Sequence, residues 1–458
     1  MIRDRALFVL LLTIGTATTG FSQPPATPDA APPPDLANYV RKADASYAWK
    51  LAGKTSSDTG TVYELDLTSQ TWHDITWTHK IQVFVPKGAK PQRTMVLWNQ
   101  GGKPSAGSGL LGLKIAEQVG APVAFLYGVP NQPLLGGKSE DALIAETFVR
   151  YLETKDSTWP LLFPMVKSVT RAMDALQAFA KAEWQADVKD FVITGASKRG
   201  WTSWLTAASG DTRVKAIAPL VIDTLNFPLQ MKNQLTAFGK PSLMIHDYTE
   251  RNLVPIPDTG DGRNLWRMVD PWIYRNAVTV PKMIINGAND PYWPLDALNS
   301  YWDDLKGEKY ILYVPNAGHN LRQKGEDGKD ELIPIRAVST LSAFCKCQVF
   351  DKKMPTHTWK YSAVPGGMQI EVGYEGTVKS QRVWTADSPT RDFRPAKWSE
   401  KVLLSGSATV EVSGPVSTTV AVSLPETGFR AMLAETEFRI GDLAFPLSTQ
   451  IRILEAKK

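Results

Sequence analysis

Six short and continuously apolar runs constrain the fold of this chain more than any other feature. Runs of this kind are typical of parallel strands that are buried on both faces of a sheet. Between two of them, residues 164–182 carry apolar side chains at the i, i+3, i+4 spacing of a helix face. Strands that alternate with helices predict a doubly wound α/β domain. The runs are TMVLW (94–98), PVAFLYGV (122–129), FVIT (191–194), AIAPLVI (216–222), KMIIN (282–286) and YILYV (310–314).

Three further segments extend this plan. Two alternating stretches within 61–86 predict an antiparallel pair of strands before the parallel ones. The connection 224–281 is long and rich in aromatic residues, which favours a cap or lid over a plain loop; a helical excursion without a substrate role is the alternative. We place the α/β domain at 35–347. Residues 356–456 are short alternating strands separated by Gly, Pro and Ser, which predicts an Ig-like β-sandwich.

The N-terminus carries a targeting pattern. Residues 1–22 combine a charged start, a short apolar core and small residues at the end, which predicts a signal peptide. We therefore expect a secreted or periplasmic protein without a stable membrane span after cleavage; an uncleaved anchor is the alternative. Residues 23–34 are rich in Pro and Ala and read as a linker.

Composition excludes several classes of function. A net charge of +5 over 458 residues, without a long basic run, argues against a nucleic-acid partner. The two cysteines, Cys345 and Cys347, are too close for an unstrained disulfide, and no histidine cluster lies near them. We expect neither a metal nor a cofactor, and the sequence does not indicate an oligomeric state.

A serine follows the apolar run 191–194 in a suggestive place. The run stops at Gly195, Ser197 comes next, and a helical stretch begins behind it. Hydrolases of the α/β type expose their nucleophile on such a strand-to-helix turn. The plain alternative is that Ser197 only caps the helix, since serine is a favoured N-cap residue.

A serine needs a base, which in turn needs an orienting acid. His319 follows the last apolar run and Asp290 follows the run before it, which gives the chain order Ser, acid, His of α/β-hydrolases. Asp290 could instead be a turn residue, because Asn-Asp-Pro favours turns. Asp223, at the end of an earlier run, is the alternative acid.

Residues beside the serine complete the candidate site. The backbone N–H groups of Lys198 and Gly101 are expected to form an oxyanion hole, and Lys198, Arg199 and Trp201 are candidates for substrate binding. A guanidinium suits a substrate carboxylate or a developing oxyanion. The alternative is that Arg199 points away and pairs with a structural carboxylate.

Several long blocks of the sequence occur in the order of one known family. The blocks are VPNQPL, SEDALIAETF, WPLLFPMVKSVTRAMD, GASKRGWTSWLTAA, LVIDTLN, VDPWIY and YVPNAGHN. They look like the PhoPQ-activated pathogenicity-related protein family (autocrine proliferation repressor-like), and this resemblance implies an exported protein with an α/β-hydrolase core. The elbow Gly195-x-Ser197-x-x-Gly200 also resembles that of glucuronoyl esterases, although Arg199 stands where G-x-S-x-G has its second glycine.

These features lead to two hypotheses of different class. The first is an exported serine hydrolase that cleaves an ester or a peptide bond of a small-molecule, polysaccharide-linked or peptide substrate, with acidic substrates favoured by the two cations. The second is a non-catalytic secreted protein that uses the same scaffold for binding or signalling.

Overall fold

The computed structural model describes residues 31–325 and 327–457. The signal peptide expected at 1–22 and most of the linker expected at 23–34 lie outside the described residues. Within the described part, no helix is both long and apolar enough to cross a membrane.

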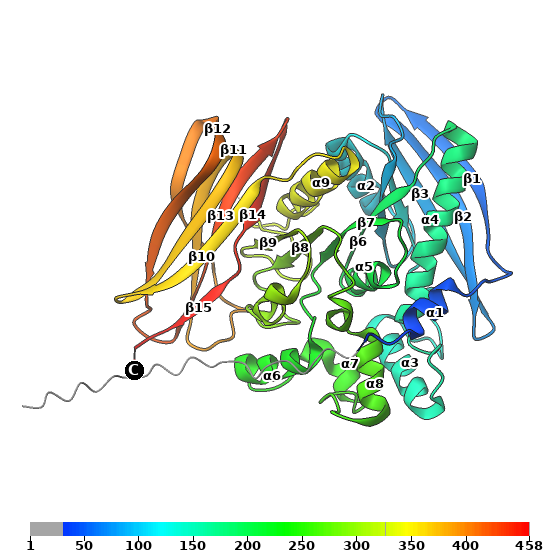
Figure 1. Ribbon diagram of the computed structural model, residues 1–458, viewed down its shortest axis with the longest axis horizontal. Helices are drawn as coiled ribbons and strands as arrows, with labels where there is room; N and C mark the ends of the chain where they lie inside the picture. Colours follow the sequence, from blue (N-terminus) through cyan, green and yellow to red (C-terminus); the bar gives the residue numbers. More distant parts are fainter. Residues whose placement is uncertain (1–30, 326, 458) are drawn as a thin grey trace, which may run out of the picture. The chain divides into compact units, whose positions relative to one another are not determined.

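A nine-stranded sheet forms the centre of the α/β domain, with its strands in the order β1-β2-β3-β5-β4-β6-β7-β8-β9 (Figure 1). The strands β1, β2 and β3 are antiparallel to one another, β5 pairs antiparallel with β3, and β4 to β9 run parallel to one another. This is the predicted α/β-hydrolase-type, doubly wound and mostly parallel sheet, with β1 as a strand that the sequence patterns did not indicate. The strands are β1 (Ala48–Ser57), β2 (Gly60–Trp72), β3 (Ile75–Pro86), β4 (Thr94–Asn99), β5 (Val123–Leu126), β6 (Asp190–Ala196), β7 (Val214–Leu220), β8 (Lys282–Gly287) and β9 (Lys309–Val314).

Helices cover both faces of this sheet, which explains why the parallel strands are continuously apolar. Along β4, Met95 and Leu97 join one hydrophobic cluster, whereas Val96 and Trp98 join the other. The first cluster includes α1 (Asp35–Arg41), α3 (Glu140–Thr154), α4 (Leu162–Trp184) and α5 (Lys198–Ala208). The second includes α2 (Ala106–Val119) and α9 (Ile335–Val349), which carries the buried, free Cys345 and Cys347.

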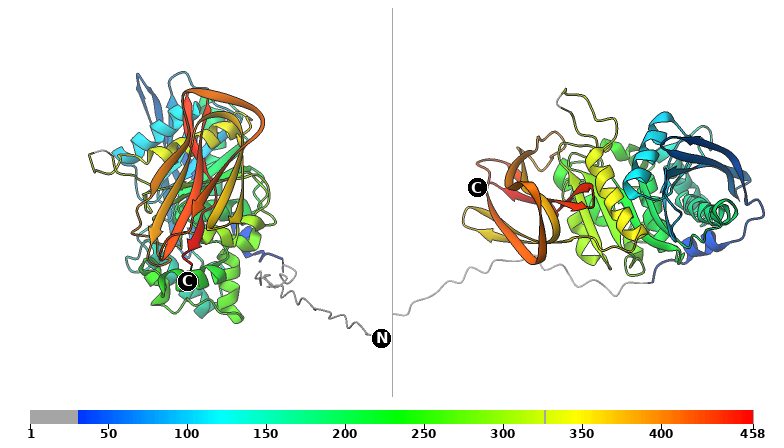
Figure 2. Two further views of the ribbon diagram at one scale, coloured as in Figure 1. Left: turned by 90° about the vertical axis from the view of Figure 1, so that its left-hand side faces the viewer. Right: turned by 90° about the horizontal axis from the view of Figure 1, so that it is seen from above.

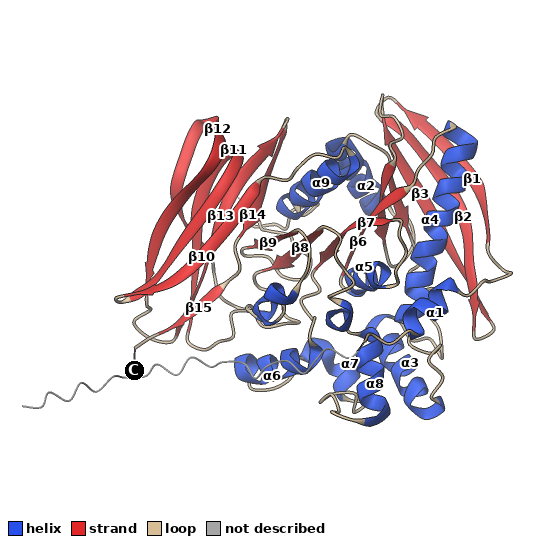
Figure 3. Cartoon of the chain, viewed as in Figure 1, coloured by secondary structure: helices blue, strands red, loops and turns tan. Residues whose placement is uncertain are grey.

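The long connection between β7 and β8 is helical. It contains α6 (Phe227–Phe238), η1 (Leu243–Ile245), α7 (His246–Thr249), α8 (Gly260–Val269) and η2 (Pro271–Tyr274). Both α7 and α8 contact α3, and Figure 3 shows these helices grouped beyond the carboxyl ends of the parallel strands. Two further short turns, η3 (Ala297–Ser300) and η4 (Trp302–Asp304), follow β8.

The C-terminal strands form a separate, all-antiparallel sheet, as expected for the β-domain. Hydrogen bonds join all six strands into one sheet, whose curl can be followed in Figure 2. The long β11 pairs with β12 over most of its length, with β10 along its first part and with β13 along its second, and register shifts follow Tyr374 and Val378. The strands are β10 (Thr356–Val364), β11 (Gly367–Ser388), β12 (Ser399–Ser423), β13 (Phe429–Ile440), β14 (Leu443–Ser448) and β15 (Arg452–Glu455).

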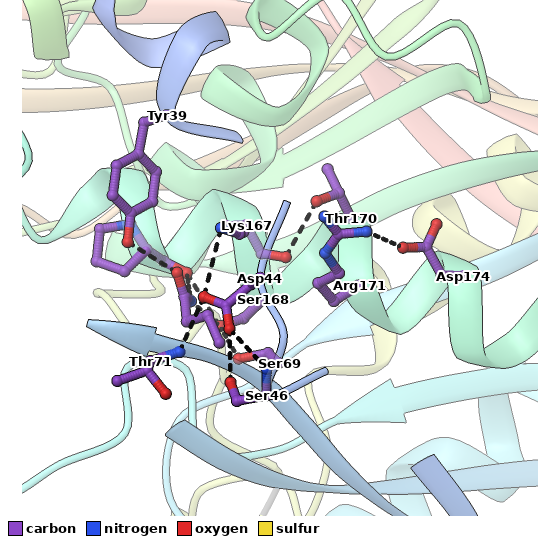
Figure 4. A network of polar contacts seen from close by, with 12 residues as sticks. Tyr39, Asp44, Ser46, Ser69, Thr71, Lys167, Ser168, Thr170, Arg171 and Asp174 are labelled. Carbon is purple, nitrogen blue, oxygen red and sulfur yellow. Dashed lines mark hydrogen bonds and ion pairs between the residues drawn. The ribbon is translucent and has the colours of Figure 1, made fainter. Parts of the chain in front are cut away.

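A buried polar network ties the segment before β1 to α4 (Figure 4). Asp44 accepts hydrogen bonds from Ser46 and from the backbone N–H of Thr71, and its carboxylate lies 3.7 Å from the ammonium of Lys167. The Tyr39 hydroxyl donates to Gln70 over 2.8 Å. Burial favours the neutral form of Lys167 and lowers its pKa, and the nearby Asp44 carboxylate opposes this shift.

The loops that follow β8 and β9 are held by the C-terminal β-domain. The side-chain amide of Asn289 lies 2.8–3.2 Å from the carbonyl oxygens of Phe393, Arg394 and Ala396. Asn316 donates to the Trp398 carbonyl over 2.9 Å and accepts from the Trp398 N–H over 2.8 Å. Each of the two loops therefore takes its shape partly from the segment 393–398.

We predict that Asn316→Ala lowers the free energy of unfolding by about 1–3 kcal/mol, because two hydrogen bonds to Trp398 are lost. Asn316 also has a φ of 57°, which alanine tolerates poorly. Asn316→Gly removes the same bonds but fits this φ, so its stability should fall between those of the wild type and the alanine variant. Urea unfolding measures the stability of the wild type and of both variants. An alanine variant as stable as the wild type would show that the two hydrogen bonds to Trp398 do not stabilise the fold.

Candidate active site

Ser197 stands on a sharp turn between β6 and α5. Its backbone has φ 58° and ψ −125°, a conformation that is strained for a residue with a Cβ atom, and its N–H donates to the Leu220 carbonyl over 2.9 Å. A serine that merely caps a helix has extended dihedrals and accepts a hydrogen bond from the first turn. Ser197 occupies the N-cap position but makes no such side-chain bond. Its hydroxyl is therefore not used to stabilise the helix.

Two glycines allow this turn. A Cβ atom on Gly195 would lie 2.6 Å from the side chain of Asn99, and one on Gly200 would lie 2.7 Å from the side chain of Ile222. Both distances are too short for real contacts. The second close approach thus falls one residue later than in G-x-S-x-G, which explains how Arg199 can occupy the position of the usual glycine.

Asp290 and His319 meet at the carboxyl end of the sheet. The Nδ1 atom of His319 lies 2.8 Å from Oδ2 of Asp290, and Oδ1 of the same carboxylate accepts the N–H of Tyr292 over 2.9 Å. Asp290 therefore serves the turn and the histidine at once. A side chain at Gly287 would overlap the carbonyls of Ala317 and Gly318, so this glycine lets the two loops approach.

One pocket contains both Ser197 and His319. Its remaining walls come from α3, α5, the end of β7 and the helical insertion, so the insertion contributes to the pocket as a cap would. Trp201 belongs to the lining, and its indole N–H donates to the Val269 carbonyl over 2.6 Å. The lining residues are Asp141, Ser197, Lys198, Trp201, Val221, Ile222, Thr224, Phe227, Met231, Ile245, Tyr248, Val254, Trp266, Tyr292, Trp293 and His319.

Arg199 is directed to a carboxylate of the protein itself. Its two terminal nitrogens each lie 2.7 Å from an oxygen of Glu140, and Nε donates to the Val129 carbonyl over 2.6 Å. Burial would raise the pKa of Glu140, but hydrogen bonds and charge attraction, chiefly from Arg199, lower it to about 2. Arg199 is absent from the pocket lining, which favours the structural alternative over substrate binding.

Lys198 reaches the pocket, but its charge is also matched. Its ammonium lies 2.8 Å from Asp141 and 3.4 Å from Glu140. The backbone N–H of Lys198 is the first of α5, so no carbonyl of the helix accepts it and the helix leaves it available for an oxyanion. Gly101 follows β4, and a side chain there would overlap the guanidinium of Arg199. The Lys198 side chain is thus held by its ion pair with Asp141, and the Gly101 backbone lies against the Arg199 guanidinium.

Asp223, the alternative acid, has other partners. It is buried, and its two oxygens accept hydrogen bonds from Tyr301 over 2.6 Å and from Tyr313 over 3.0 Å. Burial raises the pKa of Asp223 to about 7, although the two tyrosines oppose this. A carboxyl that is largely neutral below this pH and bonded to two phenols is poorly suited to orient a histidine as an anion.

Sequence patterns missed several residues around this site. Glu140 and Asp141 open α3, far along the chain from the cations that they neutralise, and acidic residues in a first helical turn have an ordinary explanation. Asn289 and Asn316 resemble loop residues. Among residues 31–325 and 327–457, no group of three or more His, Cys, Asp or Glu side chains could hold a metal ion.

We predict that Asp223→Asn becomes progressively more stable relative to the wild type between pH 5 and pH 8. The folded protein holds the Asp223 proton up to about pH 7, whereas the unfolded chain releases it near 3.8. The stabilising contribution of the protonated carboxyl is therefore complete below pH 3.8 and is lost as the pH rises through 7. Melting temperatures of both proteins across this range test the idea, and a constant difference would refute it.

Comparisons with known proteins give one sequence relative and two solved structures to which this chain is similar. The chain is 30% identical to autocrine proliferation repressor protein A of Dictyostelium discoideum, over 94% of this chain and 89% of that protein. Acetyl xylan esterase 1 from a Thermoanaerobacterium species aligns with 64% of this chain and 90% of its own, at 15% identity and a TM-score of 0.44. An S-formylglutathione hydrolase from Agrobacterium tumefaciens aligns with 66% of this chain and 99% of its own, at 16% identity and a TM-score of 0.44.

The family assignment rests on the sequence itself. The sequence model of the family described as PhoPQ-activated pathogenicity-related protein matches residues 36–394. This range includes all the parallel strands, the helical insertion, and two of the three residues whose carbonyl oxygens contact Asn289, Phe393 and Arg394. With a relative at 30% identity over nearly the full chain, the protein belongs to the PhoPQ-activated pathogenicity-related protein family.

Proposed function

We propose that this protein is a serine hydrolase in which Ser197, His319 and Asp290 transfer an acyl group to water. The observation that carries the proposal is the Asp290–His319 hydrogen bond, together with a pocket that is lined both by His319 and by a strained serine whose hydroxyl makes no capping bond. In the proposed reaction, Ser197 Oγ adds to a carbonyl while Nε2 of His319 accepts its proton. Asp290 keeps the other ring nitrogen protonated and stabilises the imidazolium.

The remaining steps use the same groups. The backbone N–H groups of Lys198 and Gly101 would stabilise the oxyanion of the tetrahedral intermediate. His319 then gives its proton to the departing alcohol or amine, which leaves an ester on Ser197. A water molecule loses a proton to His319, attacks this ester, and releases the acid with a free serine. The scheme applies to an ester or a peptide bond.

Two further statements belong to this proposal. We infer export from the pattern of residues 1–22, and localisation of the full chain would test it. The name of the Dictyostelium relative refers to repression of proliferation, so a signalling role without catalysis is the competing function. The labelling experiment that follows separates the two.

We predict that a fluorophosphonate labels the folded protein on Ser197 and that Ser197→Ala abolishes labelling. The reagent requires a serine activated by a base, so Thr202→Ala, which removes a hydroxyl one turn further along α5 that is already bonded to the Lys198 carbonyl, should label normally. Intact mass spectrometry with peptide mapping reads the result. A folded wild type that stays unlabelled would favour the non-catalytic role.

A second prediction concerns Asp290 as the acid that orients His319. By analogy with the serine-protease triad, Asp290→Asn should lower kcat by about 10⁴-fold because the histidine loses its orienting carboxylate. Asp223→Asn should reduce kcat far less, since the Asp223 oxygens are bonded to Tyr301 and Tyr313. Steady-state kinetics with one activated ester compares the two variants. The opposite ranking would assign the acid to the end of β7.

A further inference from the structure

We propose that the pocket beside Ser197 selects a substrate moiety that is uncharged and apolar, and that it discriminates against the acidic substrates suggested by the two cations. This inference rests on the proposed hydrolase function and adds the substrate class.

Aromatic side chains of α5 and the insertion form the pocket walls. Phe227 lies 5.1 Å from Trp201 and 4.7 Å from Trp266, measured between ring centroids. Trp201 and Trp266 donate their indole N–H groups to the carbonyls of Val269 and Leu253, so both rings are fixed with their polar edges already bonded. Because the rings contact one another and their donors are occupied, they offer the substrate mainly apolar surface.

The charged groups in and beside the pocket lining neutralise one another. Lys198 and Asp141 belong to the lining and pair with each other, and Arg199 and Glu140 form a second ion pair beside them. Asp141 further accepts a hydrogen bond from the Tyr248 hydroxyl over 3.0 Å. A substrate carboxylate would lose its hydration here without gaining a free cation, which is costly for a buried charge. Its best route to Lys198 would require displacing Asp141.

The lining also contains a buried polar group without a partner. Thr224 is fully buried, and its hydroxyl has no hydrogen-bond partner among the described residues. A buried hydroxyl without a partner carries a desolvation cost that a ligand atom could relieve. The pocket therefore suits an apolar group that carries a neutral hydrogen-bonding atom, such as an ether, carbonyl or hydroxyl oxygen.

Two matched pairs of esters test the proposal. In the first pair the charge is on the acyl side, with 4-nitrophenyl butyrate against 4-nitrophenyl hemisuccinate. In the second it is on the alcohol side, with 1-naphthyl acetate against the acetate of a naphthol that carries a carboxylate. We expect kcat/KM to favour the neutral ester at least tenfold in one pair or both. Equal values in both pairs would overturn the inference.

Variants assign the discrimination to the ion-pair cluster. Asp141→Asn leaves the cluster of Lys198, Arg199 and Glu140 with one uncompensated positive charge and should reduce the preference for the neutral ester by about tenfold. Glu146→Gln lies on the same helix and removes a partner of Lys138 and Arg150 instead, so the preference should not change. An unchanged preference in a folded Asp141→Asn protein would overturn the charge argument. If that variant does not fold, Lys198→Met, which leaves an uncompensated anion, must increase the preference.

Labelling separates the two levels of the proposal. If the wild type reacts with a fluorophosphonate but hydrolyses the acidic and neutral esters equally, the selectivity inference fails and the hydrolase function stands. If the folded wild type neither labels nor hydrolyses any of the four esters, the hydrolase function fails and the inference fails with it.

Discussion

The ion pair between Arg199 and Glu140 joins the parts of this site. Arg199 stands two residues after Ser197, and its guanidinium lies close to Gly101 and bonds to the start of α3 and to the Val129 carbonyl. The loop after β4, the loop after β5 and the turn after β6 are thereby held by one side chain. Losing Glu140 would be costly, because the Arg199 side chain is only 10% exposed and would be left as a buried charge without this partner.

Local chemistry made much of this arrangement predictable. Strands buried on both faces must be continuously apolar, so their ends could be located, and Ser197, Asp290 and His319 could be found as polar residues at those ends. The same reasoning recognised the insertion 224–281 by its length. β1 escaped notice because only its partner β2 shows regular alternation, whereas most residues of β1 are exposed.

The remaining features depend on contacts that sequence spacing does not encode. Whether Arg199 meets a substrate or Glu140 is decided by where α3 begins, 59 residues earlier in the chain. The partners of the C-terminal strands are likewise set across the chain, because β11 pairs with β10 along its first part and with β13 along its second, which the alternating pattern does not reveal. In both cases the sequence indicates the residue type or the strand, whereas the partner of that residue or strand depends on a distant part of the chain.

The clamp formed by Asn289 and Asn316 has a consequence for how the two halves of the chain can vary. The side chains of both asparagines form these hydrogen bonds with main-chain atoms of residues 393–398. A substitution at the exposed Lys397 should therefore leave the loops beside Asp290 and His319 undisturbed, whereas Phe393 and Trp398 are buried in the core and are constrained by packing. An insertion or deletion of one residue there would shift the carbonyls themselves. The β-domain is thus joined to the α/β domain through the backbone path of one loop, and exchanging the β-domain for another would require this loop to be kept.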